Sequence, residues 1–236
     1  NRTRLSDYEE ALEQGADSIL WMHRSNFELS GFTEEPSLAE LSKLATDHDV
    51  PLIYDLGTGL LWDTADLNLR AEPTIQDKAV QLADVSLFSG DKLFGGPQAG
   101  IIVGNQASIE KLTKHPFARA LRADKLTTAA LAATLESHLA ESPDDLPVYQ
   151  MLTMSRAELD ERANTLASHL IERQFKIIDV TDTVGGGTMP NSELPGLALE
   201  LKTDSPEQLH AALRASPLPI VTRIQENAVL VHVRTI

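Results

Sequence analysis

The sequence predicts an α/β fold with a mostly parallel sheet over residues 1–145, followed by a linking helix and a small α+β domain over residues 146–236. Two observations favour this fold class. In the first part, short apolar runs alternate with helical patterns, and the order strand, helix, strand implies parallel pairing. In the second part, several strand-like runs surround one helical segment, which favours antiparallel pairing.

The first elements are a helix, a strand, a second helix and a second strand. We expect a short helix at 5–15, and the apolar runs at 17–23 and 50–54 are typical of buried strands, the second of which ends at Asp55. A capping box starts the helix between them, since Ser37 is followed three positions later by a glutamate. The face that this helix is expected to bury consists of Leu38, Leu41, Leu44 and Ala45.

Two more strands and two helices complete the first part. The strands are expected at 84–88 and 99–103, separated by a turn rich in glycine and proline. The helices are expected at 106–114 and 125–140. A break follows at 141–147, where the sequence reads ESPDDLP.

A long amphipathic helix at 153–173 is predicted to lead into the small domain. Its inward face is expected to consist of Leu159, Ala163, Leu166, Ala167 and Leu170. Strands are expected at 175–181, 196–202, 219–224 and 228–234. The one helix among them, at 206–215, is expected to be capped by Ser205 and Gln208.

Composition limits the class of protein. Hydrophobic residues make up 42% and charged residues 23%, as in ordinary globular proteins. No apolar run approaches the roughly 18–20 residues of a transmembrane helix. There is no cysteine, which excludes disulfides, cysteine-ligated zinc and thiol catalysis and fits a cytoplasmic protein. The net charge of −15 argues against a broad nucleic-acid surface, although it permits a small basic site. Because the chain begins at Asn1 without a methionine, we expect a fragment of a longer protein.

Asp55 and Lys92 stand at the ends of two predicted strands, where open α/β sheets bind ligands. Taken singly, each has an ordinary interpretation, a turn-forming aspartate and an exposed turn lysine. Lys92, however, lies among glycines that permit close approach of a ligand, and a desolvated lysine can act as an amine nucleophile. An aspartate for the pyridine nitrogen and a lysine for the aldehyde are what pyridoxal 5'-phosphate (PLP) requires. The pair therefore predicts a PLP site.

The segment 89–104, SGDKLFGGPQAGIIVG, resembles the lysine motif of bacterial selenocysteine synthase, the L-seryl-tRNA(Sec) selenium transferase family of aminotransferase-like, fold type I PLP enzymes. The resemblance extends over nearly the whole chain and is weaker in the small domain. Further matching segments are NRT at 1–3, HRSNF at 23–27, GFT at 31–33, DLGTG at 55–59, HP at 115–116, RALRADK at 119–125, and 219–223 and 231–234 in the small domain.

The resemblance implies roles at the cofactor. Lys92 is expected to bind PLP covalently and to move protons at the substrate, and Ser89 to bind the cofactor phosphate. Either Asn26 or His23 is expected to contact the cofactor ring, and Asn26 could instead only shape its loop. Asp91 either assists proton movement or fixes the turn through backbone hydrogen bonds.

Arg119 and Arg122 are three positions apart, so on a continuous helix they would share a face. Two guanidinium groups on one face suit an oxyanion, although a solvated basic face is the plainer interpretation. The resemblance implies that they bind the selenium donor, selenophosphate. No metal is expected.

The resemblance thus implies conversion of seryl-tRNA(Sec) to selenocysteinyl-tRNA(Sec), by β-elimination and then selenium addition. It also implies a homo-oligomer built as a ring of dimers, with the tRNA bound mainly by a region outside this chain. Two alternatives stay open. One is a related PLP lyase for a small amino or sugar acid, which would need Asp55 and Lys92 but neither arginine. The other is a catalytically silent assembly module of the same fold.

Overall fold

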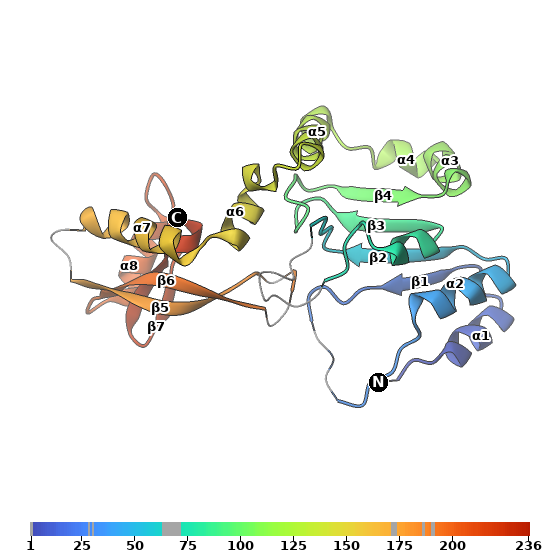
Figure 1. Ribbon diagram of the computed structural model, residues 1–236, viewed down its shortest axis with the longest axis horizontal. Helices are drawn as coiled ribbons and strands as arrows, with labels where there is room; N and C mark the ends of the chain where they lie inside the picture. Colours follow the sequence, from blue (N-terminus) through green and yellow to red (C-terminus); the bar gives the residue numbers. More distant parts are fainter. Residues whose placement is uncertain are drawn as a thin grey trace. The chain divides into compact units, whose positions relative to one another are not determined.

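The computed structural model describes residues 2–27, 29, 31–62, 72–170, 174–185, 187–189 and 192–236. The chain forms two compact units (Figure 1). Unit 1 comprises Asn1–Leu146 with Gly185–Pro190, and unit 2 comprises Pro147–Val184 with Asn191–Ile236.

A four-stranded sheet in the order β1-β2-β3-β4 organises unit 1. Its strands are β1 (Ile19–Met22), β2 (Leu52–Gly57), β3 (Val85–Ser89) and β4 (Gly100–Gly104). The first three are parallel, and β4 runs antiparallel to β3 because the turn between them is too short for a parallel crossover. The expected α/β architecture with a mostly parallel sheet is confirmed. The end of β2 was placed too early, since the strand continues past Asp55 to Gly57.

The helices of unit 1 are α1 (Leu5–Glu13), α2 (Leu38–Asp47), η2 (Lys78–Leu82), α3 (Gln106–Lys114), α4 (Pro116–Ala120), α5 (Lys125–Leu139) and η3 (Pro143–Asp145). The capping box of α2 is confirmed, because the Ser37 N–H donates to Glu40 Oε2 at 2.8 Å and the Glu40 N–H donates to Ser37 Oγ at 3.3 Å. Its predicted apolar face is buried as expected. That face packs on the sheet in one core with Ile19, Leu52, Tyr54, Leu56 and Phe88.

Unit 2 contains a four-stranded sheet in the order β5-β6-β8-β7. All its strand pairs are antiparallel, which confirms the expected pairing. Its strands are β5 (Phe175–Thr183), β6 (Glu193–Lys202), β7 (Arg223–Gln225) and β8 (Ala228–His232). Its helices are α6 (Pro147–Thr153), α7 (Arg156–Ser168), α8 (Pro206–Arg214) and η4 (Val233–Thr235).

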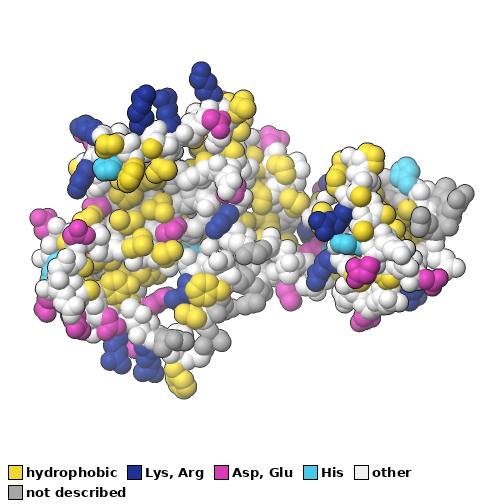
Figure 2. All heavy atoms as spheres, turned by 180° about the vertical axis from the view of Figure 1, so that it is seen from behind, with side chains coloured by type: hydrophobic (Ala, Val, Ile, Leu, Met, Phe, Trp, Pro, Cys, Tyr) yellow, Lys and Arg dark blue, Asp and Glu magenta, His cyan; other side chains and the backbone are white. Residues whose placement is uncertain are grey.

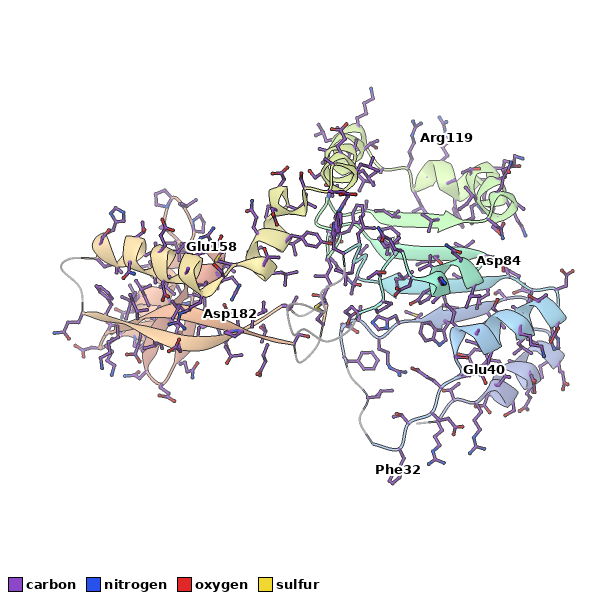
Figure 3. The ribbon with its side chains drawn as sticks, in the orientation of Figure 1. Phe32, Glu40, Asp84, Arg119, Glu158 and Asp182 are labelled. Atoms are coloured by element: carbon purple, nitrogen blue, oxygen red, sulfur yellow. The ribbon has the colours of Figure 1, made fainter. Side chains whose placement is uncertain are left out.

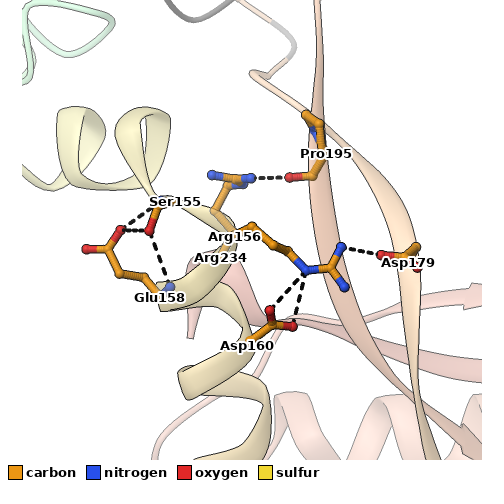
Figure 4. Close-up of polar contacts among 7 residues, drawn as sticks. All are labelled: Ser155, Arg156, Glu158, Asp160, Asp179, Pro195 and Arg234. Carbon is orange, nitrogen blue, oxygen red and sulfur yellow. Dashed lines mark hydrogen bonds and ion pairs between the residues drawn. The ribbon is translucent and has the colours of Figure 1, made fainter.

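The predicted long helix at 153–173 is wrong in its extent, because two helices meet there. α6 ends at Thr153, and α7 starts behind Ser155, whose hydroxyl accepts a hydrogen bond from the Glu158 N–H at 3.3 Å (Figure 4). In turn, the Ser155 N–H donates to Glu158 Oε2 at 2.7 Å, so the two residues form a second capping box. The residues predicted to face inward all pack in the core of unit 2, although the last of them, Leu170, lies beyond the end of α7 at Ser168.

Two further expectations in unit 2 are wrong. Ser205 precedes α8 without making a side-chain cap, and its N–H, the expected partner of Gln208, donates to Thr203 Oγ1 at 3.4 Å. The expected strand at 219–224 is reduced to its last two residues. Pro219 has no N–H for a ladder, and the Ile220 N–H donates to the Leu213 carbonyl at the end of α8.

A buried ionic cluster joins the ends of the small-domain strands. Asp182 accepts hydrogen bonds from His232 Nδ1 at 2.6 Å and from Arg234 Nε at 2.7 Å. The same guanidinium donates to the carbonyls of Met151 and Pro195, the second of which is drawn in Figure 4. Burial opposes ionisation of Asp182, but the bonds from His232 and Arg234 outweigh it and hold the pKa of Asp182 below its ordinary value.

None of the helices in the described part of the chain combines the length and the apolar character that crossing a membrane requires.

Candidate functional site

The carboxyl ends of β1, β2 and β3 lie at one edge of the unit 1 sheet, because parallel strands end on the same side. His23 directly follows β1, and its N–H donates to the carbonyl of Asp55 in β2 at 2.8 Å. Ser89 is the last residue of β3. Three of the residues that the sequence singled out therefore lie along a single sheet edge.

The turn that bears Lys92 is fastened to the loop after β2. The Leu93 N–H donates to the Thr58 carbonyl at 2.9 Å, and the Gly95 N–H closes the turn on the Lys92 carbonyl at 3.0 Å. Gly90 is needed at its start, since a Cβ there would lie 2.8 Å from the Pro97 carbonyl oxygen. Lys92 itself is half-buried.

Two glycines leave space around the lysine side chain. A Cβ added at Gly57 would lie 2.8 Å from Ser25 Oγ and 3.9 Å from Lys92 Nζ. The serine hydroxyl and the lysine amine are therefore both close to the position that a side chain at residue 57 would take. A Cβ added at Gly187 would have Lys92 Cε, at 3.7 Å, as its nearest neighbour. A side chain at 57 or 187 would therefore be in van der Waals contact with the Lys92 side chain, and the buried Ser25 hydroxyl lies against the same Gly57 position.

Asp55 has one oxygen in use. Oδ1 accepts the Gly57 N–H at 2.9 Å, and Oδ2 has no hydrogen-bond partner among the residues that the structure describes. Asp55 is half-buried in the strand next to the one that leads to Lys92. A carboxylate with one oxygen fixed and one available can accept a hydrogen bond from a protonated ring nitrogen.

His23 makes an unforeseen contact. Its Nε2 lies 2.7 Å from Oε2 of Glu72, whose side chain is fully buried. Sequence reasoning missed Glu72, which is 49 positions from its partner and belongs to no motif. Sequence reasoning also missed Ser25, which lies inside the matching segment HRSNF, because nothing in the local sequence shows that its hydroxyl is buried against Gly57.

The other predicted cofactor residues are less constrained. Asn26 and Asp91 are exposed, and within the described ranges neither makes a hydrogen bond, so the turn-fixing role considered for Asp91 is not observed. Ser89 is half-buried and pairs in the ladder with Gly100.

Arg119 and Arg122 do not share a helix face. Arg119 lies in the last turn of α4 and points away from the sheet (Figure 3), whereas the helix ends at Ala120 and Arg122 lies in the connection to α5. The helix cannot continue, because Asp124 caps α5 by accepting the N–H groups of Leu126 and Thr127. Both arginines are exposed, and neither forms an ion pair with a described residue.

An apolar groove of about 540 Å³ lies beside the arginines, between β4, α3 and α4. Apolar side chains gather over this part of unit 1 in Figure 2. Phe117 is 69% exposed and Leu121 is 81% exposed. The groove is lined by Ile102, Ile109, Leu112, Thr113, His115, Phe117, Ala118 and Leu121.

The residues at the sheet edge fit PLP. An accessible amine, a carboxylate oxygen without a partner and a glycine that keeps the space open are all present at the ends of β2 and β3. Two buried polar atoms nearby, Thr58 Oγ1 and Glu72 Oε1, also have no partner among the described residues. Unsatisfied buried groups of this kind are common where a ligand or water completes the hydrogen bonding.

Comparison with known proteins gives a consistent family. A family model described as L-seryl-tRNA selenium transferase matches residues 1–236. The chain is 42% identical over 245 residues to the L-seryl-tRNA(Sec) selenium transferase of Clostridium perfringens and to that of Geobacter metallireducens, covering all of this chain and 53% of each relative. It therefore spans about half the length of the curated relatives it matches.

A solved structure shows the same fold. The structure of D-glucosaminate-6-phosphate ammonia-lyase matches with a TM-score of 0.63 at 17% identity, over 100% of this chain and 57% of that chain. The expected fold class, that of the aminotransferase-like fold type I enzymes, is confirmed.

Proposed function

Since this chain belongs to the L-seryl-tRNA selenium transferase family, we propose that it is the lysine-bearing portion of a PLP enzyme that converts seryl-tRNA(Sec) to selenocysteinyl-tRNA(Sec). The observation that supports this most directly is the Lys92 amine, which lies 3.9 Å from the Cβ position of Gly57, at the end of the strand that holds Asp55. In this proposal residues 1–145 belong to the cofactor-binding domain, and residues 146–236 form the small domain with its linking helices.

When bound, PLP supplies an electron sink for negative charge at the substrate α-carbon. Lys92 binds the cofactor through Nζ, removes the α-proton and later returns one. Asp55 keeps the ring nitrogen protonated through its available oxygen, and Ser89 binds the phosphate. His23 and Asn26 are the candidates for contact with the ring.

In the first half of the reaction the α-proton and the β-hydroxyl leave the seryl group as water. In the second half selenium bonds to the β-carbon, the α-carbon regains a proton, and water cleaves the P–Se bond of the donor, which leaves as phosphate. Asp91, exposed next to Lys92, is placed in sequence to assist these proton movements. Arg119 and Arg122 bind the doubly charged selenophosphate through charge-assisted hydrogen bonds.

We further propose that the enzyme is a cytoplasmic homo-oligomer, a ring of dimers. The groove between β4, α3 and α4 supports an assembly contact, because apolar side chains as exposed as Leu121 gain from burial against another surface. A second subunit seated there would also bring the exposed arginines next to other protein groups. The tRNA is bound mainly by a region outside this chain, in keeping with its net charge of −15.

The test is covalent labelling of the full-length enzyme. PLP is added, the product is reduced with borohydride, and the labelled peptide is mapped in the wild type and in Lys92→Ala. We expect the label on Lys92 and its loss in the variant, with selenocysteinyl-tRNA formed only by the wild type when selenophosphate is supplied. A label on Lys78 or Lys125 would overturn the lysine assignment. No label at all would favour a silent assembly module, and elimination without any use of selenophosphate would favour a lyase.

A further inference from the structure

The pair formed by His23 and Glu72 is the strongest feature near the site that the proposed function does not use. Glu72 is fully buried at its side chain, and His23 is 15% exposed. A carboxyl group removed from water is unfavourable unless it is paired. The structure provides one partner, His23 Nε2, at 2.7 Å, and leaves Glu72 Oε1 without one among the described residues.

Glu72 is anchored independently of His23. The segment after it is held by the Ile75 N–H, which donates to the Leu60 carbonyl at 2.8 Å. His23 is held from the other side, since its N–H donates to the Asp55 carbonyl. The side-chain contact therefore joins the end of β1 to a separate, fixed segment, and it restrains the imidazole ring in one orientation.

The contact also decides where the imidazole proton lies. An ionised carboxylate can only accept hydrogen bonds, so the histidine nitrogen that faces it must be the protonated one. The other ring nitrogen, Nδ1, has no partner within the described ranges and is left as an acceptor. Burial first, and then the nearby carboxylates of Asp77, Glu72 and Asp55, raise the pKa of Tyr54 in the neighbouring strand.

We propose that Glu72 is a positioning residue of this site, which fixes His23 in the tautomer protonated at Nε2 and holds its ring in place for the cofactor. The inference rests on the proposed function, in which His23 is one of two candidates for contact with the cofactor ring. It adds a residue that acts on the site through His23. Carboxylates orient histidines in this way in other proteins, where the hydrogen bond to one ring nitrogen decides which nitrogen carries the proton.

The first experiment needs no cofactor. The full-length protein is labelled with ¹⁵N-histidine, and the imidazole signals are recorded at about pH 8.5, where an ordinary imidazole is neutral. The His23 signals are assigned with His23→Gln. We expect the wild type to carry its proton on Nε2, and Glu72→Gln to lower the ratio of the Nε2–H to the Nδ1–H form at least about tenfold, since a bond to a charged acceptor is lost.

The matched control is Glu35→Gln, the same chemical change at an exposed glutamate that pairs with Arg24 at 2.7 Å, next to His23. It should leave the His23 tautomer unchanged. The proposal is overturned if wild-type His23 carries its proton on Nδ1, or if Glu72→Gln behaves like the wild type. The wild-type measurement alone decides the question if Glu72→Gln does not fold.

The second experiment uses the PLP-loaded protein and its circular dichroism band in the visible range. We expect Glu72→Gln and His23→Gln to change the band alike, and the double variant to add nothing further, because one residue acts through the other. Additive changes, or an unchanged band in Glu72→Gln, would overturn the positioning role. Labelling of Lys92 is scored separately. If Lys92 is labelled but the tautomer does not respond to Glu72, only this inference fails. If the tautomer responds but Lys92 is never labelled, the proposed function fails.

Discussion

Gly57 offers a sharp test of the site geometry. A methyl group added there tests both the left-handed backbone conformation of this residue and the packing of Ser25 and Lys92 around it. Gly57 has φ of +73°, a left-handed conformation that disfavours alanine by about 1–2 kcal/mol. The added Cβ would also lie 2.8 Å from Ser25 Oγ and 3.1 Å from Ser25 Cβ. Ser25 is only 6% exposed and has little room to move, so we add about 1–3 kcal/mol for overpacking. Gly57→Ala should therefore destabilise the protein by roughly 2–5 kcal/mol.

Gly15 provides the matched control. It also has positive φ, +99°, but an added Cβ would have no atom within 4 Å. Gly15→Ala should therefore show only the backbone penalty of about 1–2 kcal/mol. Urea unfolding of the apo protein measures both variants, and the difference between them isolates the crowding at Ser25.

Cofactor binding gives an independent measurement of the same change. The new methyl group would lie 3.9 Å from Lys92 Nζ, inside the space assigned to PLP, so Gly57→Ala should also weaken PLP loading measured by absorbance. Gly15→Ala should load normally. If Gly57→Ala is no less stable than Gly15→Ala and loads PLP equally well, Gly57 is neither crowded by Ser25 nor part of the cofactor site.

Two further predictions concern charged groups. Arg119→Ala and Arg122→Ala should each raise the selenophosphate requirement of the full-length enzyme about tenfold to a hundredfold with a normal PLP absorbance band, because each removes a charge-assisted bond. Titration curves like that of the wild type, or loss of the band, would contradict the anion site. Asp182→Asn should destabilise unit 2 by about 3–5 kcal/mol at pH 7, since it breaks a buried ionic cluster. The pKa of Asp182 is lowered in the folded protein, so its contribution is complete above the unfolded value and is lost as the pH falls below about 4. The difference in urea midpoint between wild type and variant should therefore shrink between pH 7 and pH 3, and a constant difference would refute the linkage.

Local patterns predicted much of the fold, because the interactions behind them are local. The capping box at Ser37 and the buried face of α2 depend on residues within one or two turns, and both are observed. The break between α6 and α7 was missed, although Ser155 and Glu158 form a box of the same kind, because apolar residues continue across it. The expected strand at 219–224 was too long because a helix end, not a neighbouring strand, takes the Ile220 N–H.

In the site, too, the features set by nearby residues in the sequence could be predicted, and those set by residues far apart in the sequence could not. Asp55 and Lys92 could be predicted because each follows an apolar run, and parallel strands bring such ends to one edge. Ser25 and Glu72 could not be ranked from sequence. Ser25 was singled out because its hydroxyl would lie 2.8 Å from a Cβ added at Gly57. Glu72 was singled out because its side chain pairs with His23, 49 positions away in the sequence. Neither contact produces a motif or a periodic pattern of residues in the sequence.

The two arginines show where an argument from sequence spacing fails. Spacing of i, i+3 places two side chains on one face only while the helix continues, and here α4 ends between Arg119 and Arg122. If both bind the same donor anion, they do so as two separately held guanidinium groups. The connection that holds Arg122 is fixed at its far end by the Asp124 cap of α5. The position of Arg122 therefore depends on that cap as well as on α4, and an anion site built in this way would be weakened by loosening the connection even with both arginines intact.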